Sequence, residues 1–355
     1  MAFATPSRLL HIQSLRGLAA LLVLLSHLVQ VEGRTVSAPI LPDSLTFGMM
    51  GVDLFFVISG FIMVFVTRDW TRPGRQGEFL FARAARIYPL YWIVSLAVLA
   101  VWLVRPDLVF SSSPNEPQLL NSVLLTPAYA YPLLEVGWTL VYEMGFYLVF
   151  ALLLCLPGRL RPWGLAAWGA LVALGLALGW QHINAVSFHL INPLTFEFLA
   201  GAGVALAFLR WKGSRALGWA LFAAGLGSLL VWLVIGDAGF EDGGARVIRF
   251  ALPSASLVLG AALLDRHGVG APRALVALGD WSYSLYLTHL LSLVLLSKGF
   301  RAAGLDVPGL FPVAAIAFAV LVSALSYRLV EAPLHAGARR IRRHVFAPPD
   351  RAPSA

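Results

Sequence analysis

The stretch "LRGLAALLVLLSHL", residues 15–28, carries two ionisable side chains in a run that is otherwise apolar. Arg16 begins the run and His27 ends it, eleven positions later. At about 100° per residue in an α-helix, their directions differ by only about 20°, so they share one face and lie roughly 16 Å apart along the axis. Either residue alone has a structural explanation, because Arg16 can extend to lipid headgroups and His27 can bond a neighbouring carbonyl. The aligned pair favours a functional site.

The composition indicates an integral membrane protein. Of the 355 residues, 59% are hydrophobic and only 12% are charged, and the mean hydropathy is +0.79; a soluble domain has about 25% charged residues. The net charge of +8 follows membrane topology, so we expect no nucleic-acid partner. A single cysteine, Cys155, excludes an intramolecular disulfide and a cysteine-based metal site. Because the chain also lacks an HExxH-type spacing, we expect no bound metal.

Apolar runs long enough to cross about 30 Å of hydrocarbon recur along the whole chain. They lie near residues 12–30, 47–66, 87–104, 136–156, 164–180, 191–210, 217–236, 248–265, 280–297 and 309–330. The first run resembles a signal peptide, but Arg16 within it and the lack of a small-x-small cleavage site favour a spanning helix. We therefore predict an all-α polytopic membrane protein, a single bundle of about ten transmembrane helices. The bundle is expected over residues 1–335, followed by a basic cytoplasmic tail over 336–355 that we expect to be disordered.

Basic residues are distributed unevenly between the two sides of this topology. With a cytoplasmic N-terminus, about three arginines or lysines lie on the inner side for each one outside. Cytoplasmic loops of membrane proteins carry such an excess. The sequence therefore predicts that both termini face the cytoplasm and that the protein is a multi-pass protein of the cell's inner membrane.

Further polar side chains fall at membrane depth in other runs. Asp53, in "GVDLFFVISGFIM", lies at a depth similar to that of His27, and Glu143 lies in "GWTLVYEMGFY". Either carboxylate could hydrogen-bond His27, which would fix its tautomer and raise its basicity. Glu143 also has a structural explanation, as a hydrogen bond between helices. In "GDWSYSLYLTHL", Tyr286 and His289 share a face, with His289 near mid-membrane.

Three more acidic residues have competing interpretations. Asp280 precedes a predicted helix, which favours a helix N-cap. Glu197 and Asp265 lie within apolar runs, where packing between helices and chemistry explain them equally well. For these two residues the alternatives stay open.

Arginines gather where the third run begins. In "FARAARIYPLYW", Arg83 and Arg86 are i, i+3 neighbours on a helix. Positive-inside topology explains the number of arginines, but explains less well why Arg83, Arg86 and Arg16 reach the same level. Arginine binds phosphate through paired N–H groups. A phosphate-bearing ligand at this level is therefore one of two open explanations.

Seven segments follow the order typical of one known family. They are "SLRGLAALLVLLSH", "GVDLFFVISGFIM", "RAARIYPLYW", "GWTLVYEMGFY", "TFEFLAG", "GDWSYSLYLTH" and "VEAPL", and together they extend from residue 11 to about residue 334. On these segments the chain resembles the membrane acyltransferase-3 family, and most of all the exopolysaccharide acetyltransferases of the ExoZ type. Val141 departs from the asparagine often found there, so the contribution of that amide to the acceptor side does not carry over. We expect no appended extracellular esterase-like domain.

The resemblance implies an integral-membrane O-acyltransferase. Such an enzyme moves an acyl group, usually acetyl, from cytoplasmic acyl-CoA to a carbohydrate hydroxyl. By motif match, Arg16 and His27 carry over as the essential pair, and Glu143 and Arg86 as further functional positions. The expected co-substrate is acetyl-CoA, and the expected partners are the lipid bilayer and a polysaccharide or lipid-linked oligosaccharide acceptor.

These expectations assign a role to each candidate residue. His27 is the general base on the acceptor hydroxyl, oriented by Asp53 or Glu143 as the third member orients a triad histidine. A covalent acyl-histidine intermediate is the open variant. The remaining assignments are donor binding by Arg16, Arg83 and Arg86, and acceptor binding by Trp138, Tyr142, Tyr286 and His289.

Two other classes of protein fit part of the pattern. A proton-coupled transporter of a glycan or small metabolite also uses His, Asp and Glu within the membrane. Against it, the halves of the chain show no repeat, and the inner arginines have no role in a transporter. A binding or sensor protein that has lost catalysis is the third class. Dependence on acyl-CoA distinguishes the acyltransferase from both.

Overall fold

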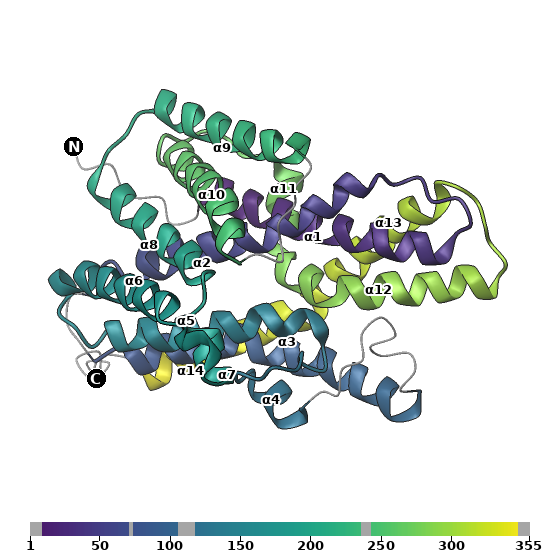
Figure 1. The fold of residues 1–355 in the computed structure, drawn as a ribbon, viewed down its shortest axis with the longest axis horizontal. Helices are drawn as coiled ribbons and strands as arrows, with labels where there is room; N and C mark the ends of the chain where they lie inside the picture. Colours follow the sequence, from purple (N-terminus) through teal and green to yellow (C-terminus); the bar gives the residue numbers. More distant parts are fainter. Residues whose placement is uncertain (1–8, 71–73, 106–117, 236–242, 347–355) are drawn as a thin grey trace, which may run out of the picture.

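The computed structural model describes residues 9–70, 74–105, 118–235 and 243–346, and every regular element in these ranges is a helix (Figure 1). The long helices are α1 Leu10–Thr35, α2 Gly51–Val66, α3 Gln76–Val104, α5 Trp138–Leu153, α6 Arg161–Ala177, α8 Thr195–Arg210, α9 Arg215–Ile235, α10 Gly243–Arg266, α12 Ser282–Ala302 and α13 Leu310–Ser326. The shorter α-helices are α4 Leu119–Leu124, α7 Ala185–Leu190, α11 Arg273–Asp280 and α14 Ala332–Val345. The 3-10 helices are η1 Asp43–Met50, of eight residues, and the single turns η3 Glu135–Gly137, η4 Gly158–Leu160 and η5 Trp180–His182; η6 Tyr327–Glu331 is π-helical.

The predicted all-α membrane fold is confirmed. In the described part of the chain, nine helical stretches are long and apolar enough to cross a membrane, and they match nine of the predicted spans. The remaining predicted span, 280–297, is the 21-residue helix α12, which lies outside that set. Its buried face carries Ser282, Ser284, Thr288, His289 and Ser292, which makes it less apolar than its neighbours. A helix inside the bundle can carry such a face because the other helices shield it from lipid.

The helices pack around α2. This helix contacts α8 and α10, while α1 contacts α11 and α12, and α12 contacts α13. In Figure 1, α1, α12 and α13 run side by side toward one end of the molecule. The α2–α8 contact is close because one glycine of each helix faces the backbone of the other helix. A Cβ added at Gly60 would lie 1.9 Å from the Phe198 oxygen, and one at Gly201 would lie 1.8 Å from the Val57 oxygen. Small residues allow this approach between membrane helices.

The C-terminal helix is continuous from α13 through the π-helical turn η6 into α14. Residues 336–345, which we expected to be a disordered tail, therefore form most of α14, while 347–355 lie outside the described residues. The helix is held against α3, where Arg342 Nε donates to Glu78 Oε1 at 3.0 Å. Arg75 binds the other oxygen of the same carboxylate, so Glu78 joins two basic segments.

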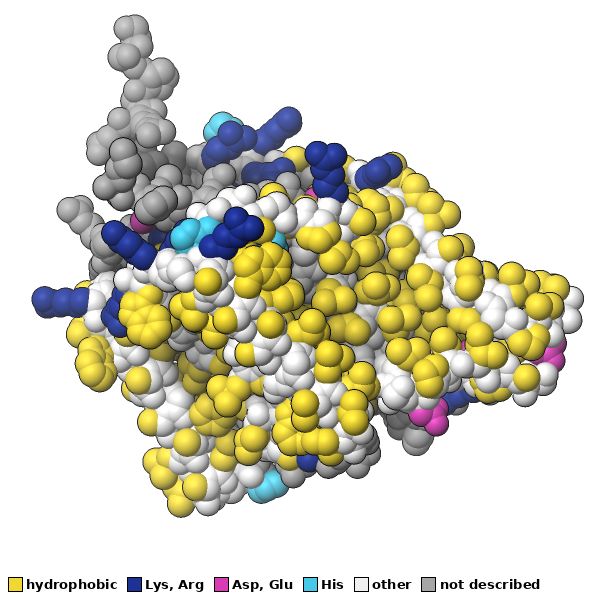
Figure 2. Space-filling model, turned by 90° about the horizontal axis from the view of Figure 1, so that it is seen from above, with side chains coloured by type: hydrophobic (Ala, Val, Ile, Leu, Met, Phe, Trp, Pro, Cys, Tyr) yellow, Lys and Arg dark blue, Asp and Glu magenta, His cyan; other side chains and the backbone are white. Residues whose placement is uncertain are grey.

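The surface has the distribution expected of a bilayer protein. Figure 2 shows a broad band of hydrophobic side chains with Lys and Arg gathered along one edge. Many large apolar side chains face outward, among them Leu171, Leu230 and Val234, and only 17% of the apolar window of α9 is buried inside the protein. Lipid rather than protein covers such faces.

Candidate active site

Side chains from five helices enclose a cavity of about 360 Å³, which we call the arginine cavity. Its polar lining consists of Gln13 and Arg16 from α1, Ser59 from α2, Arg83 and Arg86 from α3, Thr139, Glu143 and Tyr147 from α5, and Ser282, Tyr283 and Tyr286 from α12. The structure thus brings together the arginines that the sequence placed at one level. Arg83 and Arg86 reach the same cavity because they are one helical turn apart.

Arg16 is oriented by a relay of side chains. Arg16 Nη1 donates to Gln13 Oε1 at 3.1 Å, and Gln13 Nε2 donates to Asp280 Oδ1 at 2.9 Å. Asp280 is the last residue of α11, and α12 begins after Trp281 without a side-chain cap. The predicted N-cap role of Asp280 is therefore wrong. Its carboxylate instead accepts a hydrogen bond from the Gln13 amide, whose oxygen in turn accepts one from Arg16.

The relay depends on a close approach between α1 and α11. A Cβ at Gly17 would lie 2.6 Å from the Leu275 oxygen, and a Cβ at Gly279 would lie 1.9 Å from the Gln13 oxygen. Contacts under 3.0 Å require a shift of the backbone. These two glycines therefore set the distance at which Gln13 can reach Asp280.

Glu143 connects two helices at the wall of the arginine cavity. It accepts hydrogen bonds from Ser59 Oγ on α2, at 2.6 Å, and from the Tyr147 hydroxyl one turn further along α5. Its charge acts on Arg16 and Arg83 across the cavity. The predicted hydrogen bond from Glu143 to His27 is not among the contacts of the described residues. Glu143 instead faces the arginines, because it lines the same cavity as Arg16 and Arg83.

His27 on α1 and His289 on α12 face each other. His289 Nε2 lies 3.4 Å from His27 Nδ1, and the ring centroids are 5.0 Å apart. His27 Nδ1 also lies 3.0 Å from the Val23 oxygen, and His289 Nδ1 lies 2.7 Å from the Tyr286 oxygen. A ring nitrogen that faces a carbonyl oxygen carries the proton, because the carbonyl only accepts. In a neutral His27 ring, Nε2 is therefore the basic nitrogen.

This pair lies beside the arginine cavity rather than in its wall. Neither histidine is among the described residues that line the cavity, but Tyr286 is. The Tyr286 and His289 ring centroids are 5.9 Å apart, and the Tyr286 hydroxyl bonds Thr139 Oγ1 and the Val136 oxygen. Tyr286 thus separates the cavity from the histidine pair.

Asp53 is occupied by a different partner from the one predicted. Arg246 on α10 binds it with both ends of its guanidinium, Nε to Oδ1 at 2.7 Å and Nη2 to Oδ2 at 3.0 Å. Asp53 is fully buried and Arg246 is 7% exposed. The prediction that Asp53 orients His27 is therefore wrong. A buried carboxylate needs a paired charge, and α10 supplies one.

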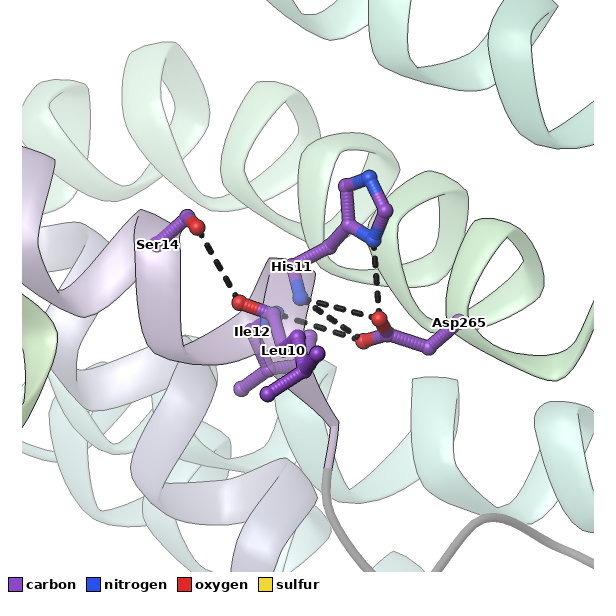
Figure 3. A network of polar contacts seen from close by, with 5 residues as sticks. All are labelled: Leu10, His11, Ile12, Ser14 and Asp265. Atoms are coloured by element: carbon purple, nitrogen blue, oxygen red, sulfur yellow. Dashed lines mark hydrogen bonds and ion pairs between the residues drawn. The ribbon is translucent and has the colours of Figure 1, made fainter. Parts of the chain in front are cut away.

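Glu197 and Asp265, for which the sequence left two explanations open, lie in different environments. Asp265 accepts from the backbone N–H of His11 at 2.9 Å and from His11 Nδ1 at 2.8 Å (Figure 3). It therefore caps the first turn of α1, where unpaired N–H groups favour a carboxylate. Glu197 is fully buried on α8 and lies within electrostatic range of Asp53 and Arg246. Glu197 thus belongs to the buried charge cluster.

The residues assigned to the acceptor fall into two places. Trp138 and Tyr142 line a second cavity of about 340 Å³, whereas Tyr286 lines the arginine cavity and His289 contacts His27. Val141, where the resemblance led us to expect an asparagine, also lines the second cavity. The residues predicted to bind the acceptor substrate therefore do not line a single surface.

Sequence reasoning missed several residues of the site. Ser59 and Tyr147 bind Glu143, and Tyr283 lines the cavity while its hydroxyl donates to the Ile87 oxygen at 2.7 Å. Ser59 had a visible signal as a polar residue in an apolar run, and Tyr147 lies one turn from Glu143. Arg246 had no such signal, because it lies at the end of an apolar run, where an arginine of an outer loop is also expected.

Comparison with known proteins identifies the family. The model of an acyltransferase domain, that of the acyltransferase-3 family, matches residues 10–328. The chain belongs to this family. It is a multi-pass membrane protein of an acyltransferase family. Five of the seven segments that carried the resemblance lie on helices that line the arginine cavity, whereas "TFEFLAG" lies on α8 and "VEAPL" on η6 and α14.

Relatives cover most of the chain. The exopolysaccharide production protein ExoZ of Rhizobium meliloti is 33% identical over 304 residues, which are 81% of this chain and 90% of that protein. The acyltransferase MdmB of Streptomyces mycarofaciens is 27% identical over 92% of each chain. The O-acetyltransferase OatA of Staphylococcus aureus is 25% identical over 81% of this chain and 52% of its own length. No solved structure matches the chain.

Proposed function

We propose that this protein transfers an acyl group, in the first place acetyl, from cytoplasmic acyl-CoA to a hydroxyl of an exported or cell-surface carbohydrate. The acyltransferase family supports the reaction type. The printed names of two relatives, exopolysaccharide production protein and O-acetyltransferase, support a carbohydrate acceptor and an acetyl group. The excess of basic residues on one side supports an inner-membrane orientation in which the arginine cavity faces the donor.

The observation that carries the proposal is the convergence of Arg16, Arg83 and Arg86 on one cavity. Arg83 Nε is buried and has no hydrogen-bond partner among the described residues. A buried donor without a partner is unusual and suggests that a ligand supplies the acceptor. Coenzyme A carries several phosphate oxygens, which guanidinium groups bind in pairs.

The chemistry is assigned to the histidine pair. His27 Nε2 removes the proton of the acceptor hydroxyl as its oxygen attacks the thioester carbonyl carbon. The new C–O bond forms, the C–S bond breaks, and the proton on His27 passes to the leaving thiolate. The products are the ester and free CoA, so the step requires no oxidant or reductant. His289 accepts from His27 Nδ1–H and holds the ring so that Nε2 stays the base.

Label transfer tests the proposal. Membranes that contain the protein are supplied with acetyl-labelled CoA and a crude glycan of the host, and label in carbohydrate is counted. We expect transfer by the wild type, and loss of transfer in His27→Ala and in Arg16→Ala at equal protein levels. The exposed residues His182 and Arg159 provide matched controls, since His182→Ala and Arg159→Ala remove the same side chains outside the cavity.

The outcomes separate the competing mechanisms. Transfer by His27→Ala at the wild-type rate would overturn the assigned chemistry. Label that stays on the wild-type protein and is lost in His27→Ala would favour the acyl-histidine variant. Absence of transfer together with a proton-coupled flux of glycan would identify a transporter instead.

A further inference from the structure

The second cavity is built mainly from aromatic and uncharged polar side chains, and we call it the aromatic cavity. Its walls come from the segment 118–132, the first turns of α5, helix α7 and the start of α10. The aromatic and polar members are Gln118, Asn121, Ser122, Thr126, Tyr129, Tyr131, Trp138, Tyr142, Phe188 and His189. This combination of flat apolar surfaces with a few hydrogen-bonding groups is typical of small-molecule sites.

The rings form a continuous series from the surface to the interior. Ring centroids are 6.1 Å apart for Tyr129 and Phe188, 5.3 Å for Phe188 and His189, 4.7 Å for His189 and Tyr142, and 5.9 Å for Tyr142 and Trp138. Tyr129 is 69% exposed, whereas Tyr142 is 7% exposed. A ligand entering past Tyr129 therefore meets aromatic surface along its whole path.

The charge of the aromatic cavity differs from that of the arginine cavity. Arg246 is the one charged side chain among the described residues that line it, and its guanidinium is bound at both ends by Asp53. A site for phosphate needs free positive charge, as three arginines supply in the other cavity. The aromatic cavity therefore suits a neutral ligand.

Helix α5 is the wall between the two cavities. Trp138, Val141 and Tyr142 face the aromatic cavity, whereas Thr139 and Glu143 face the arginine cavity. Residues spaced by three and four share a helix face, so one helix presents two faces to two ligands. Thr139 bonds the Tyr286 hydroxyl, and the Tyr286 ring contacts His289. Contacts through Thr139 and Tyr286 therefore connect α5 to the histidine pair.

We propose that the aromatic cavity is the acceptor subsite and binds a neutral sugar residue of the carbohydrate chain, an inference that rests on the proposed function. A pyranose ring has faces of C–H groups, which pack on the negative face of an aromatic ring. Its hydroxyls bond amide, phenol and imidazole groups of the kind present here. The sugar enters past Tyr129 and Phe188, and the phosphates of the donor bind in the arginine cavity on the other face of α5.

Steady-state kinetics provide the first test. Phe188→Leu keeps an apolar side chain but removes an exposed ring, so the fold should tolerate it. We expect the KM for the acceptor glycan to rise about tenfold while the KM for acetyl-CoA stays unchanged. Trp163→Leu is the control, because Trp163 is 75% exposed on α6 and lines neither cavity. An unchanged acceptor KM in Phe188→Leu would overturn the proposal.

Binding without turnover provides the second test. The probe is the set of neutral oligosaccharides released from the host's exopolysaccharide by de-acetylation and mild hydrolysis, titrated calorimetrically into protein in lipid nanodiscs without acetyl-CoA. We expect Trp163→Leu to bind as the wild type does, and Phe188→Leu to bind about tenfold more weakly. Equal binding by Phe188→Leu and the wild type would overturn the proposal.

Two further outcomes distinguish failure of the acceptor-subsite proposal from failure of the proposed function. If the wild type binds no oligosaccharide and retains a phospholipid that Phe188→Leu loses, the aromatic cavity holds a lipid chain and the proposal is overturned. Absence of label transfer by the wild type would contradict the proposed acyltransferase, while the binding titration would still decide whether the cavity takes sugar.

Discussion

His289 Nε2 lies 3.4 Å from His27 Nδ1, so the partner of the proposed base is a second histidine on a neighbouring helix. We predict that His289→Ala lowers kcat/KM about ten- to a hundredfold, because a misplaced ring loses its alignment with the acceptor hydroxyl. His289→Gln should restore part of the activity, since its amide oxygen can accept from His27 Nδ1–H. The pH–rate profile should shift in His289→Ala and stay unchanged in His182→Ala. Equal rates for His289→Ala and wild type would contradict this role.

Asp53 is expected to contribute stability rather than chemistry. Asp53→Leu leaves the buried Arg246 without its charged partner, which costs about 3–5 kcal/mol. We expect a lower apparent Tm for Asp53→Leu in detergent and partial recovery in Asp53→Leu with Arg246→Met. The double variant should transfer acetyl groups with an unchanged KM for acetyl-CoA. A stable double variant without any activity would indicate that Asp53 acts in catalysis.

Arg83 should determine affinity for the phosphates of the donor. Arg83→Gln is predicted to raise the KM for acetyl-CoA about tenfold or more, because a charge-assisted hydrogen bond is lost. The KM for S-acetyl-pantetheine, which has no phosphate, should stay the same. Arg159→Gln provides the matched control on the exposed surface. An equal rise for both donors would exclude phosphate recognition by Arg83.

Asp265 should act only on the stability of α1. Asp265→Ala removes the acceptor for the His11 N–H, and losses of such caps cost about 1–2 kcal/mol. We expect a lower apparent Tm, and unchanged KM values for donor and acceptor at temperatures where the variant is folded. Asp265→Asn keeps one acceptor oxygen, so its apparent Tm should fall less than that of Asp265→Ala. A change in donor KM at full stability would assign Asp265 a role in the site.

Much of the fold could be predicted from local properties of the sequence. Hydropathy over about 20 residues identifies a spanning helix, because the bilayer sets a fixed length that each helix meets by itself. The helical period likewise places Arg16 and His27 on one face before any tertiary contact is known. The helix α12 shows the limit of this reasoning, since its polar side chains are shielded by other helices.

The partners of the polar residues were decided only by the tertiary structure. Asp53 is bound by Arg246, 193 positions along the chain, and His27 is paired with His289, 262 positions away. Such pairs depend on which helices pack together and at what rotation, and close backbone contacts such as Gly17 with Leu275 set both. The sequence by itself determined the membrane bundle and the ionisable residues that it buries. The packing decided which of them form ion pairs, which cap a helix and which line the two cavities, because each of these interactions joins helices that are distant in the chain.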